Sequence, residues 1–473
     1  LSFLLFLPIV FTLYWLVNKR GLQLQNFLLL IASYFFYACW DWRFLFLLLF
    51  STALDYFTGI KMEEAKTQIN KKIWFWLSII INLGFLGVFK YYNFFADSFA
   101  TALSGIGIQA NFWTLKVILP VGISFYTFHG LSYVIDIYKD RIKAERNIIT
   151  YSLFVSFFPL LVAGPIERAT HLLPQIKKKR VFDYTKAIDG LRQIIWGLFK
   201  KVVIADNCAK FANTIFDNSA DYSGSTLVLG AVFFAIQIYG DFSGYSDIAL
   251  GTARLFGIDL LRNFAFPYFS RDIAEFWRRW HISLSSWFRD YLYIPLGGSR
   301  VGILMKIRNT FIIFLISGFW HGANWTFIVW GALHALFFIP LLITKNNRNN
   351  IETVAKGKSW PTFKEFLAIL FTFSLTTFAW IFFRAESVED AVQFISGIFS
   401  KSLFSIPTIR PTDLLILIFV FFMIEWFGRE KQFALANLEM CFPKFLRWVI
   451  YYAILLALFY FGGSEQQFIY FQF

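Results

Sequence analysis

The sequence carries little charge for its length. Of its 473 residues only 16% are charged, whereas 58% are hydrophobic and 21% are aromatic. A soluble domain of this size could not bury so much apolar surface, but lipid accepts such surface freely. The shortage of charge therefore excludes an ordinary soluble protein and predicts an all-α polytopic membrane protein.

Cysteine is also scarce, and its spacing forms no recognisable motif. Cys39, Cys208 and Cys441 are far apart in the chain and make no C-x-x-C pair. Neither a disulfide framework nor a zinc site is indicated, so we expect no metal and no bound cofactor. The first apolar run lacks the small-residue cleavage site of a signal peptide, and we expect it to stay as an uncleaved span.

The formal net charge of +14 does not indicate nucleic-acid binding. The lysines and arginines lie in short loops between apolar runs, which is the pattern that orients a protein in a membrane. We expect the basic loops at 61–72, 139–147 and 345–364 on the cytoplasmic side. This assignment places both termini outside the membrane.

Long apolar runs mark the N-terminal part of the chain. The sequence predicts five crossings there, at about 1–17, 24–38, 44–60, 73–94 and 114–137. The following run, 148–163, has basic residues on both flanks and contains Pro159. Sixteen residues at about 1.5 Å each barely reach across ~30 Å of hydrocarbon, so a re-entrant or tilted pair is predicted here.

Two later segments allow more than one interpretation. Residues 191–209 could cross the membrane, or Lys200 and Lys201 could hold that helix at the interface. The run 225–260 would be about 54 Å long as one straight helix, so a break is expected near Gly240. Asp241 would then cap the second half-helix, with a direct catalytic role as the alternative.

Trp, Arg and His crowd together in the segment 271–290. Trp277, His281 and Ser285 recur at intervals of four, which predicts one helix with these side chains on one side. The mixture of aromatic and cationic residues is typical of an interfacial or cavity-lining helix. His281 is either a hydrogen-bonded core histidine or part of a functional site.

A second histidine motif, SGFWHGANW, lies between two apolar arms. The arms are 311–319 and 326–343, and thirteen residues separate Arg308 from His321. A helix of that length would carry His321 about 20 Å inward, past the midpoint of the membrane. Ionisable side chains at such depth usually mark a functional site. His334 and His129 are interpreted as packing residues.

These motifs together resemble one known family. WRRWHISLSSWFRDYLYIPLGG and SGFWHGANW are similar to membrane-bound O-acyltransferases, specifically the bacterial branch with the membrane subunits of alginate and peptidoglycan O-acetylation. Further motifs of the same branch follow in the same order: SYFFYACW, LPVGISFYTFHGLSYVIDIY, AGPIER, GLFKKVVIAD, DFSGYSDIALG, FFRAE and the terminal YFQF. The resemblance covers essentially the whole chain.

The resemblance implies one transmembrane domain over 1–473, located in the bacterial cytoplasmic (inner) membrane. Its fold would be a ring of roughly ten to eleven transmembrane helices around a thinned centre, with re-entrant and interfacial helices and a tunnel. N-terminal spans (1–147) would precede a catalytic core (148–345) and C-terminal spans (346–473). Acetyl would pass from acetyl-CoA to hydroxyls of an exported polysaccharide, directly or through an exported SGNH-type partner.

The same resemblance places the family's invariant histidine at His321 and its second histidine at His281. Attack of a hydroxyl on a thioester needs a base of near-neutral pKa, which suits His321. The oxyanion would be stabilised by a fixed donor, for which Asn324, Trp320 and His281 itself are candidates. Asp241 is a further candidate for a supporting residue of the site. Candidates for binding the donor's phosphates are Arg278, Arg279 and Arg289.

Two alternatives from other classes stay open. A transporter or channel would also contain broken helices and buried Asp and His residues, but the two histidine motifs are not copies of each other and no inverted repeat is evident. An acyltransferase that acts on a cytoplasmic lipid acceptor would need no outward route for acetyl.

Overall fold

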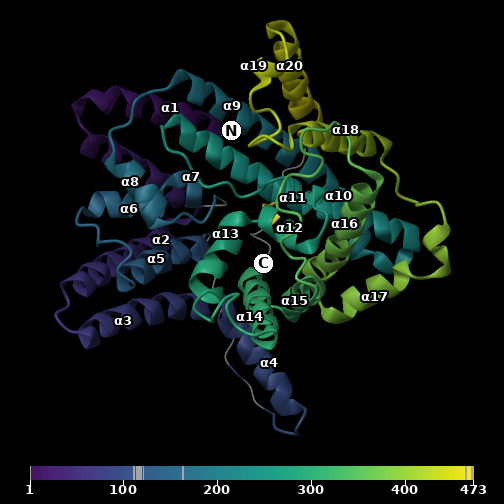
Figure 1. Cartoon of the computed structure of the whole chain (residues 1–473), viewed down its shortest axis with the longest axis horizontal. Coiled ribbons are helices and arrows are strands. Elements are labelled where there is room, and N and C mark those ends of the chain that lie inside the picture. The colour runs from purple at the N-terminus through teal and green to yellow at the C-terminus, as the bar shows by residue number, and fades with distance from the viewer. Residues whose placement is uncertain are drawn as a thin grey trace. The chain divides into compact units, whose positions relative to one another are not determined.

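The computed structural model describes residues 2–109, 112, 115, 120, 122–161, 164–463 and 466–469. All regular structure in these residues is helical, as the sequence predicts (Figure 1). The chain divides into two compact units. One comprises Leu1–Gly190 and Thr252–Leu261, and the other comprises Leu191–Gly251 and Arg262–Phe473.

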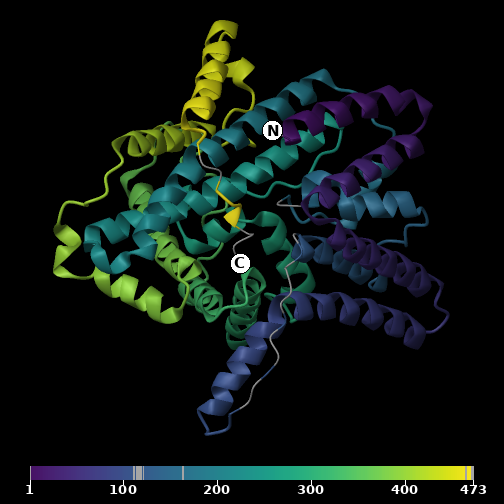
Figure 2. The same ribbon diagram turned by 180° about the vertical axis from the view of Figure 1, so that it is seen from behind.

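The first unit contains the N-terminal helices. They are α1 (Ser2–Val17), η1 (Asn18–Arg20), α2 (Leu22–Glu64), α3 (Gln68–Leu86), η2 (Gly87–Tyr91), α4 (Tyr92–Ser104), α5 (Ile123–Tyr138), α6 (Ile148–Ser156), α7 (Phe158–Leu161), α8 (Ala169–Lys177) and the start of α9 (Tyr184–Leu198). Asp41 is non-helical and kinks α2 between the two predicted runs. The π-helical η2 joins α3 to α4 where the helix axis changes direction (Figures 1 and 2).

The second unit contains the remaining helices. They are η3 (Phe199–Ala205), α10 (Asp206–Asp217), η4 (Ser219–Asp221), most of α11 (Gly224–Leu255), η5 (Pro267–Phe269), α12 (Ile273–Arg279), α13 (Ile282–Phe288), η6 (Arg289–Tyr293), α14 (Ile303–His321), α15 (Trp325–Ile343), α16 (Phe363–Arg384), α17 (Val388–Ile398), η7 (Lys401–Phe404), α18 (Thr412–Gly428), α19 (Leu438–Cys441) and α20 (Lys444–Phe461).

Polar side chains mark where several of these helices begin. Thr362 and Glu365 form a capping box at the start of α16, and Ser387 accepts a hydrogen bond from the backbone N–H of Asp390 at the start of α17. Each cap satisfies an amide that the first helical turn leaves without an intrahelical acceptor. Local sequence therefore fixes these helix starts.

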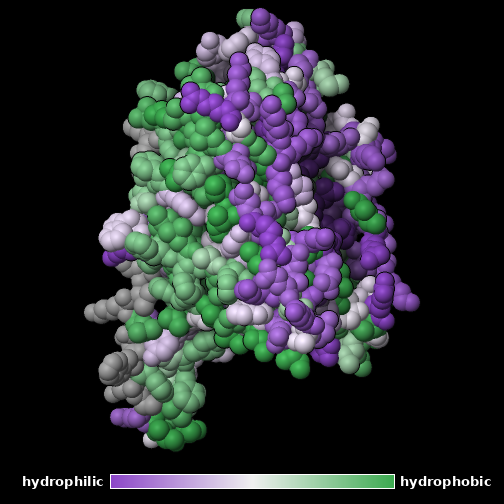
Figure 3. Space-filling view, turned by 90° about the vertical axis from the view of Figure 1, so that its left-hand side faces the viewer, coloured by the Kyte–Doolittle hydropathy of each residue, from purple (hydrophilic) through white to green (hydrophobic). Residues whose placement is uncertain are grey.

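Eight helical segments in the described part of the chain are long and apolar enough to cross a membrane. They differ in how much of their surface other helices cover: 83% of the most apolar window of α11 is buried, but only 6% of that of α20. Apolar residues also cover large areas of the face seen in Figure 3. Such exposed apolar surface suits lipid, so the polytopic membrane fold is confirmed.

The predicted break in the 225–260 run is wrong. α11 is continuous through Gly240 and Gly244. A Cβ atom at Gly244 would lie 2.8 Å from the backbone oxygen of Gly197, and one at Gly240 would lie 3.0 Å from that of Lys200. These glycines therefore serve close helix packing against α9 and η3 instead of ending the helix.

Of the two interpretations of residues 191–209, the interfacial one requires Lys200 and Lys201 to extend their side chains away from the protein. Both side chains are instead buried within the protein. Lys200 lies 2.5 Å from Asp247 Oδ2 and donates to Ser243, whereas Lys201 pairs with Asp206 and Asp241 at 2.8 and 2.7 Å. Buried ion pairs of this kind join η3 to α10 and α11.

The run 148–163 forms no crossing in its described part. α6 has nine residues, which span roughly 14 Å, and α7 has four. The short broken helices agree with the predicted re-entrant or tilted pair, although residues 162 and 163 lie outside the described part. The first residues of the expected span at 114–137 and the terminal YFQF motif also lie outside it.

Candidate active site

His321 is the last residue of α14 and is almost completely buried. Aromatic rings enclose its imidazole. The ring centroids of Trp320, Trp330 and Phe383 lie 4.8, 5.1 and 5.2 Å from that of His321. These rings come from α14, α15 and α16, so three helices meet around the histidine.

The hairpin of α14 and α15 brings His321 to this position. The two helices lie side by side (Figure 1) and join through a three-residue turn. Asn324 accepts from the backbone N–H of Thr326 to cap α15, and its amide nitrogen donates to the backbone oxygen of Glu386 at 2.7 Å. Asn324, an expected oxyanion donor, thus also ties the turn to the segment before α17.

Glycines allow α14 and α15 to pack at backbone distance. A Cβ atom at Gly318 would lie 2.2 Å from the backbone oxygen of Phe327, and one at Gly331 would lie 2.3 Å from that of Phe314. No larger residue fits at either position without a shift of the opposing backbone. Small residues at helix interfaces are a common packing device in membrane proteins.

The segment predicted as one helix over 271–290 is broken at the second histidine. α12 ends at Arg279 and α13 begins at Ile282, with His281 between them at a φ of 41°. The prediction that Trp277, His281 and Ser285 share one helical side is therefore wrong. The break depends on distant backbone groups, because Ala265 donates to the oxygen of Arg279 and Ile282 donates to that of Asn263.

His281 and His321 both contact the ring of Trp320. The ring centroid of Trp320 is 5.9 Å from that of His281 and 4.8 Å from that of His321. Phe242 of α11 packs edge-on against His281 at 4.7 Å. The structure therefore brings together His281, His321 and Trp320, which the sequence places 40 residues apart at most.

Asp241 lies on the same helix as Phe242 but serves another contact. Its Oδ1 atom pairs with Lys201, and its Oδ2 atom accepts from the backbone N–H of Ile469 at 2.7 Å. This carboxylate therefore joins α11 to η3 and to the segment near the C-terminus. Because α11 is unbroken, the predicted role of Asp241 as a helix cap is wrong.

His334, interpreted as a packing residue from the sequence, belongs to the same aromatic cluster. Its Nδ1 atom accepts from Nε1 of Trp277 at 3.2 Å, and its ring lies 4.9 Å from that of Trp330. Trp330 also contacts His321. The interval of four between Trp330 and His334 was the available signal, since it places both on one side of α15.

The three predicted donor-binding arginines have different environments. Arg279 is held by the buried carboxylate of Glu275 at 2.9 Å, together with Arg271 at 3.0 Å. Arg278 donates to the backbone oxygens of Asn347 and Asn350. Arg289 pairs with Asp290 at the protein surface.

A cavity of about 380 Å³ lies between these segments and the hairpin. Arg289 and Arg348 contribute to its wall, as do Ser317, one turn before His321, and Ser285, one turn after His281. Its other lining residues include Trp277, Phe288, Tyr293, Phe314 and Phe338. An apolar cavity with cationic residues suits a ligand that has both an acyl or alkyl part and phosphates.

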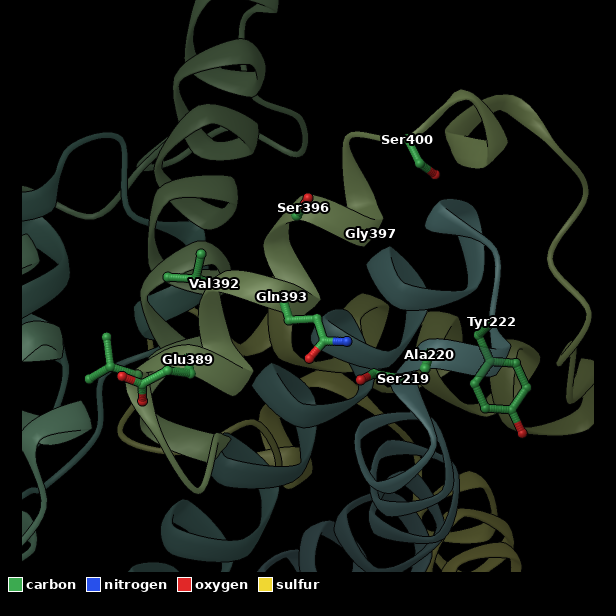
Figure 4. A pocket seen from close by; sticks show the side chains of 10 residues that line it. Ser219, Ala220, Tyr222, Glu389, Val392, Gln393, Ser396, Gly397 and Ser400 are labelled. Carbon is green, nitrogen blue, oxygen red and sulfur yellow. The ribbon is translucent and has the colours of Figure 1, made fainter.

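A second, more open hollow of about 810 Å³ lies between η4 and α17 (Figure 4). Gln393 and Ser219 face each other across it, and Tyr222 lies at one side. Its lining has no lysine or arginine and includes the carboxylate of Glu389.

Comparisons with known proteins agree with the geometry. The model of the MBOAT, membrane-bound O-acyltransferase family matches residues 138–369, which include both histidine motifs. The chain is 38% identical to the probable alginate O-acetylase AlgI of Pseudomonas aeruginosa, over 93% of this chain and 82% of that protein. It is 39% identical to the peptidoglycan O-acetyltransferase of Helicobacter pylori, over 83% and 77%.

A more distant relative transfers a different acyl group. The teichoic acid D-alanyltransferase of Bacillus subtilis is 27% identical over 56% of this chain and 69% of its own length.

Proposed function

The chain belongs to the membrane-bound O-acyltransferase family, and from this premise we propose that it moves acetyl from acetyl-CoA to hydroxyls of an exported polysaccharide. The protein is an acyltransferase, and its activity is the O-acetylation of polysaccharides at the membrane. The observation that carries the finer proposal is the position of His321. It is the last residue of α14, one turn beyond Ser317, and Ser317 lines the cavity with apolar and cationic walls.

His321 acts as the base in this proposal. The acceptor oxygen forms a bond to the acetyl carbon while the bond from that carbon to sulfur breaks. The hydroxyl proton passes to His321 and then to the thiolate of coenzyme A, so the reaction needs no further reactant. The enclosing rings of Trp330 and Phe383 exclude water, which strengthens electrostatic stabilisation of the oxyanion by nearby N–H groups such as that of Trp320.

The donor occupies the 380 Å³ cavity, with the phosphates of coenzyme A at Arg289 and Arg348. Guanidinium groups pair well with phosphate. Arg279 is a weaker candidate, because Glu275 already holds its guanidinium group. Arg278 has its NH1 and NH2 groups directed at backbone oxygens, so it orders the 347–350 loop beside the cavity.

The acceptor side lies at the opposite end of the hairpin. Lys306 and Arg308 near the start of α14 favour the cytoplasm for that end, as do Lys345 and Arg348 after α15. The turn at 322–324 then faces outward, where the polysaccharide or an exported SGNH-type partner receives acetyl. This orientation corresponds to the inner membrane of a bacterium with both termini outside.

Reconstituted vesicles test this function directly. The purified protein, supplied with acetyl-CoA and an acceptor glycan, is expected to release free coenzyme A and to place acetyl on the glycan or on the exported partner. Arg289→Ala with Arg348→Ala should raise KM for acetyl-CoA, whereas Arg300→Ala, an exposed arginine outside the cavity, should not. Release of coenzyme A only with a lipid acceptor on the donor side would overturn the proposal.

Measurements in cells can identify the acceptor. Acetyl content of purified wall and of exopolysaccharide, measured with and without this protein, separates peptidoglycan from an alginate-like glycan. No change in either fraction would contradict a polysaccharide acceptor.

A further inference from the structure

Asn263 holds the segment around His281 with both backbone and side chain. Its backbone oxygen accepts from Ile282 N–H at 2.9 Å, and its Oδ1 atom lies 3.0 Å from Nδ1 of His281. The same Oδ1 atom accepts from the hydroxyl of Ser283 at 2.9 Å and from its backbone N–H at 3.4 Å. The amide nitrogen of Asn263 donates to Ser246 at 3.2 Å.

These contacts fix which nitrogen of His281 carries the hydrogen. A backbone N–H can only donate, so the atom that faces Ser283 N–H is the amide oxygen of Asn263. The same oxygen faces Nδ1 of His281, and Nδ1 must therefore carry the hydrogen. In a neutral imidazole with a hydrogen on Nδ1, Nε2 is an acceptor with a free lone pair.

Nε2 of His281 is the ring atom that faces away from Asn263. It is buried and has no hydrogen-bond partner among the described residues. Buried polar atoms of native proteins are normally satisfied, so this atom in a candidate site calls for a partner, which a bound substrate would supply. The backbone of His281 is also held at a φ of 41°, which is unusual for a residue with a side chain.

The surroundings keep His281 neutral. Phe242 of α11, Phe264 of the 262–266 segment and Trp320 of α14 pack against its ring, and none of them titrates. Burial lowers the pKa of His281 to about 3. Four titratable groups lie closest in sequence to these contacts and to His281 itself. Asp241 precedes Phe242 and pairs with Lys201, and Arg262 lies two residues before Phe264. His321 follows Trp320, and Arg279, two residues before His281, pairs with Glu275.

We propose that Nε2 of His281 accepts a hydrogen bond from an O–H or N–H group of the bound substrates, and that Asn263 is the positioning residue that keeps it in this form. The proposal rests on the proposed function and changes the role of one residue in it. A neutral His281 whose Nδ1–H is directed at Asn263 has no hydrogen with which to stabilise an oxyanion. Oxyanion stabilisation then falls to other N–H groups, and His281 orients the substrate beside the base.

Substitution of Asn263 by aspartate and by leucine separates the possible roles. Asn263→Leu removes the acceptor for Nδ1–H and should lower kcat by about 10- to 100-fold, the range found when the partner that orients a metal-ligating histidine is lost. Asn263→Asp keeps an acceptor at the same place, so it should restore most activity at high pH. Its carboxylate favours the imidazolium and raises the pKa of His281.

The pH profile of Asn263→Asp gives the decisive readout. If His281 accepts, activity of this variant falls as the pH is lowered from 8 to 5 more steeply than that of the unmodified protein, because protonation removes the lone pair. If His281 instead donates to an oxyanion, relative activity of the variant rises on acidification, and the proposal is wrong. Equal losses in both variants with an unchanged profile would leave Asn263 a purely structural role and also overturn it.

Failure of the proposal for His281 and Asn263 can be distinguished from failure of the proposed function. All three proteins are compared by release of coenzyme A from acetyl-CoA in the same vesicles, and folding is checked by their thermal transitions in detergent. Absence of release from the unmodified protein would contradict the proposed function. All three proteins contain His321, so its titration affects their pH profiles equally and does not change the comparison between them.

Discussion

The two histidine-bearing regions of the second unit are held together in different ways. α14 and α15 are regular helices of 19 residues each, and glycines bring their backbones together. α12 and α13 have seven residues each, and side-chain ion pairs and distant backbone hydrogen bonds hold them. The first arrangement supplies rigidity around His321, and the second sets the unusual backbone of His281.

This difference predicts two kinds of substitution: those that lower the rate of acetyl transfer and those that lower the stability of the fold around the site. His321 lies at the end of a regular helix whose close backbone contacts with α15 are made at Gly318 and Gly331. His281 lies in a break that exists only because other residues maintain it. The following substitutions test that contrast.

The largest expected effect is on turnover. His321→Ala should lower the rate of acetyl transfer by about 10²- to 10⁴-fold, the range of a general base, without loss of the α14–α15 hairpin. The measurement is coenzyme A release in vesicles, with the thermal transition as the check of folding. Near-normal turnover would remove the base assignment.

Loss of the Glu275 charge should chiefly reduce stability. Glu275 is 1% exposed and holds both Arg271 and Arg279. Glu275→Gln leaves two partly buried guanidinium groups without their common counter-charge, and removal of one member of a buried pair costs about 3–5 kcal/mol. A lower thermal transition should result. The exposed pair Lys356 and Glu352 offers a control, since Glu352→Gln should change stability little.

Overpacking of the hairpin should have a smaller effect. Gly318→Ala places a Cβ atom against the backbone oxygen of Phe327, and such strain costs about 1–3 kcal/mol. Gly84→Ala in α3 is the matched control, because a Cβ atom there has no neighbour within 4 Å. Similar thermal transitions for both variants would show that close backbone packing does not hold α14 to α15.

The smallest effect is expected where the two regions meet. Trp277 of α12 donates to His334 of α15 at 3.2 Å. Trp277→Phe keeps an aromatic ring and removes this hydrogen bond, whose net contribution is about 0.5–1.5 kcal/mol. Thermal stability should fall slightly while kcat changes by less than that of His321→Ala. A loss of activity as large as that of His321→Ala would place this hydrogen bond in the catalytic mechanism.

Hydropathy and charge predicted the regular part of the fold well. The arms around His321 are a lipid-length hairpin in the structure, because continuous apolar runs and flanking basic residues determine such elements locally. The break at His281 could not be predicted in the same way. The intervals of four between Trp277, His281 and Ser285 fit one helix, and the contacts that interrupt it come from Asn263 and Ala265.

Buried charge was the other weakness of sequence reasoning. In the sequence Lys200 and Lys201 resemble residues of a membrane surface, because no acidic partner is evident at helical spacing. Their partners Asp206, Asp241 and Asp247 lie in other turns and in another helix. The pair of Glu275 and Arg279, by contrast, was visible as an interval of four. Ion pairs within one helix can be predicted from spacing, whereas pairs between helices require the fold.

The short turn between α14 and α15 has a consequence for how the protein is made. Two apolar arms joined by three residues enter the bilayer most readily together, as one folded hairpin, since separate entry would leave backbone groups of the turn without partners in hydrocarbon. His321 and Asn324 then travel at the leading tip during biosynthesis. In the proposed orientation, with both ends of the hairpin at the cytoplasm, the residues proposed to make the enzyme active are the first of this hairpin to reach the far side of the membrane.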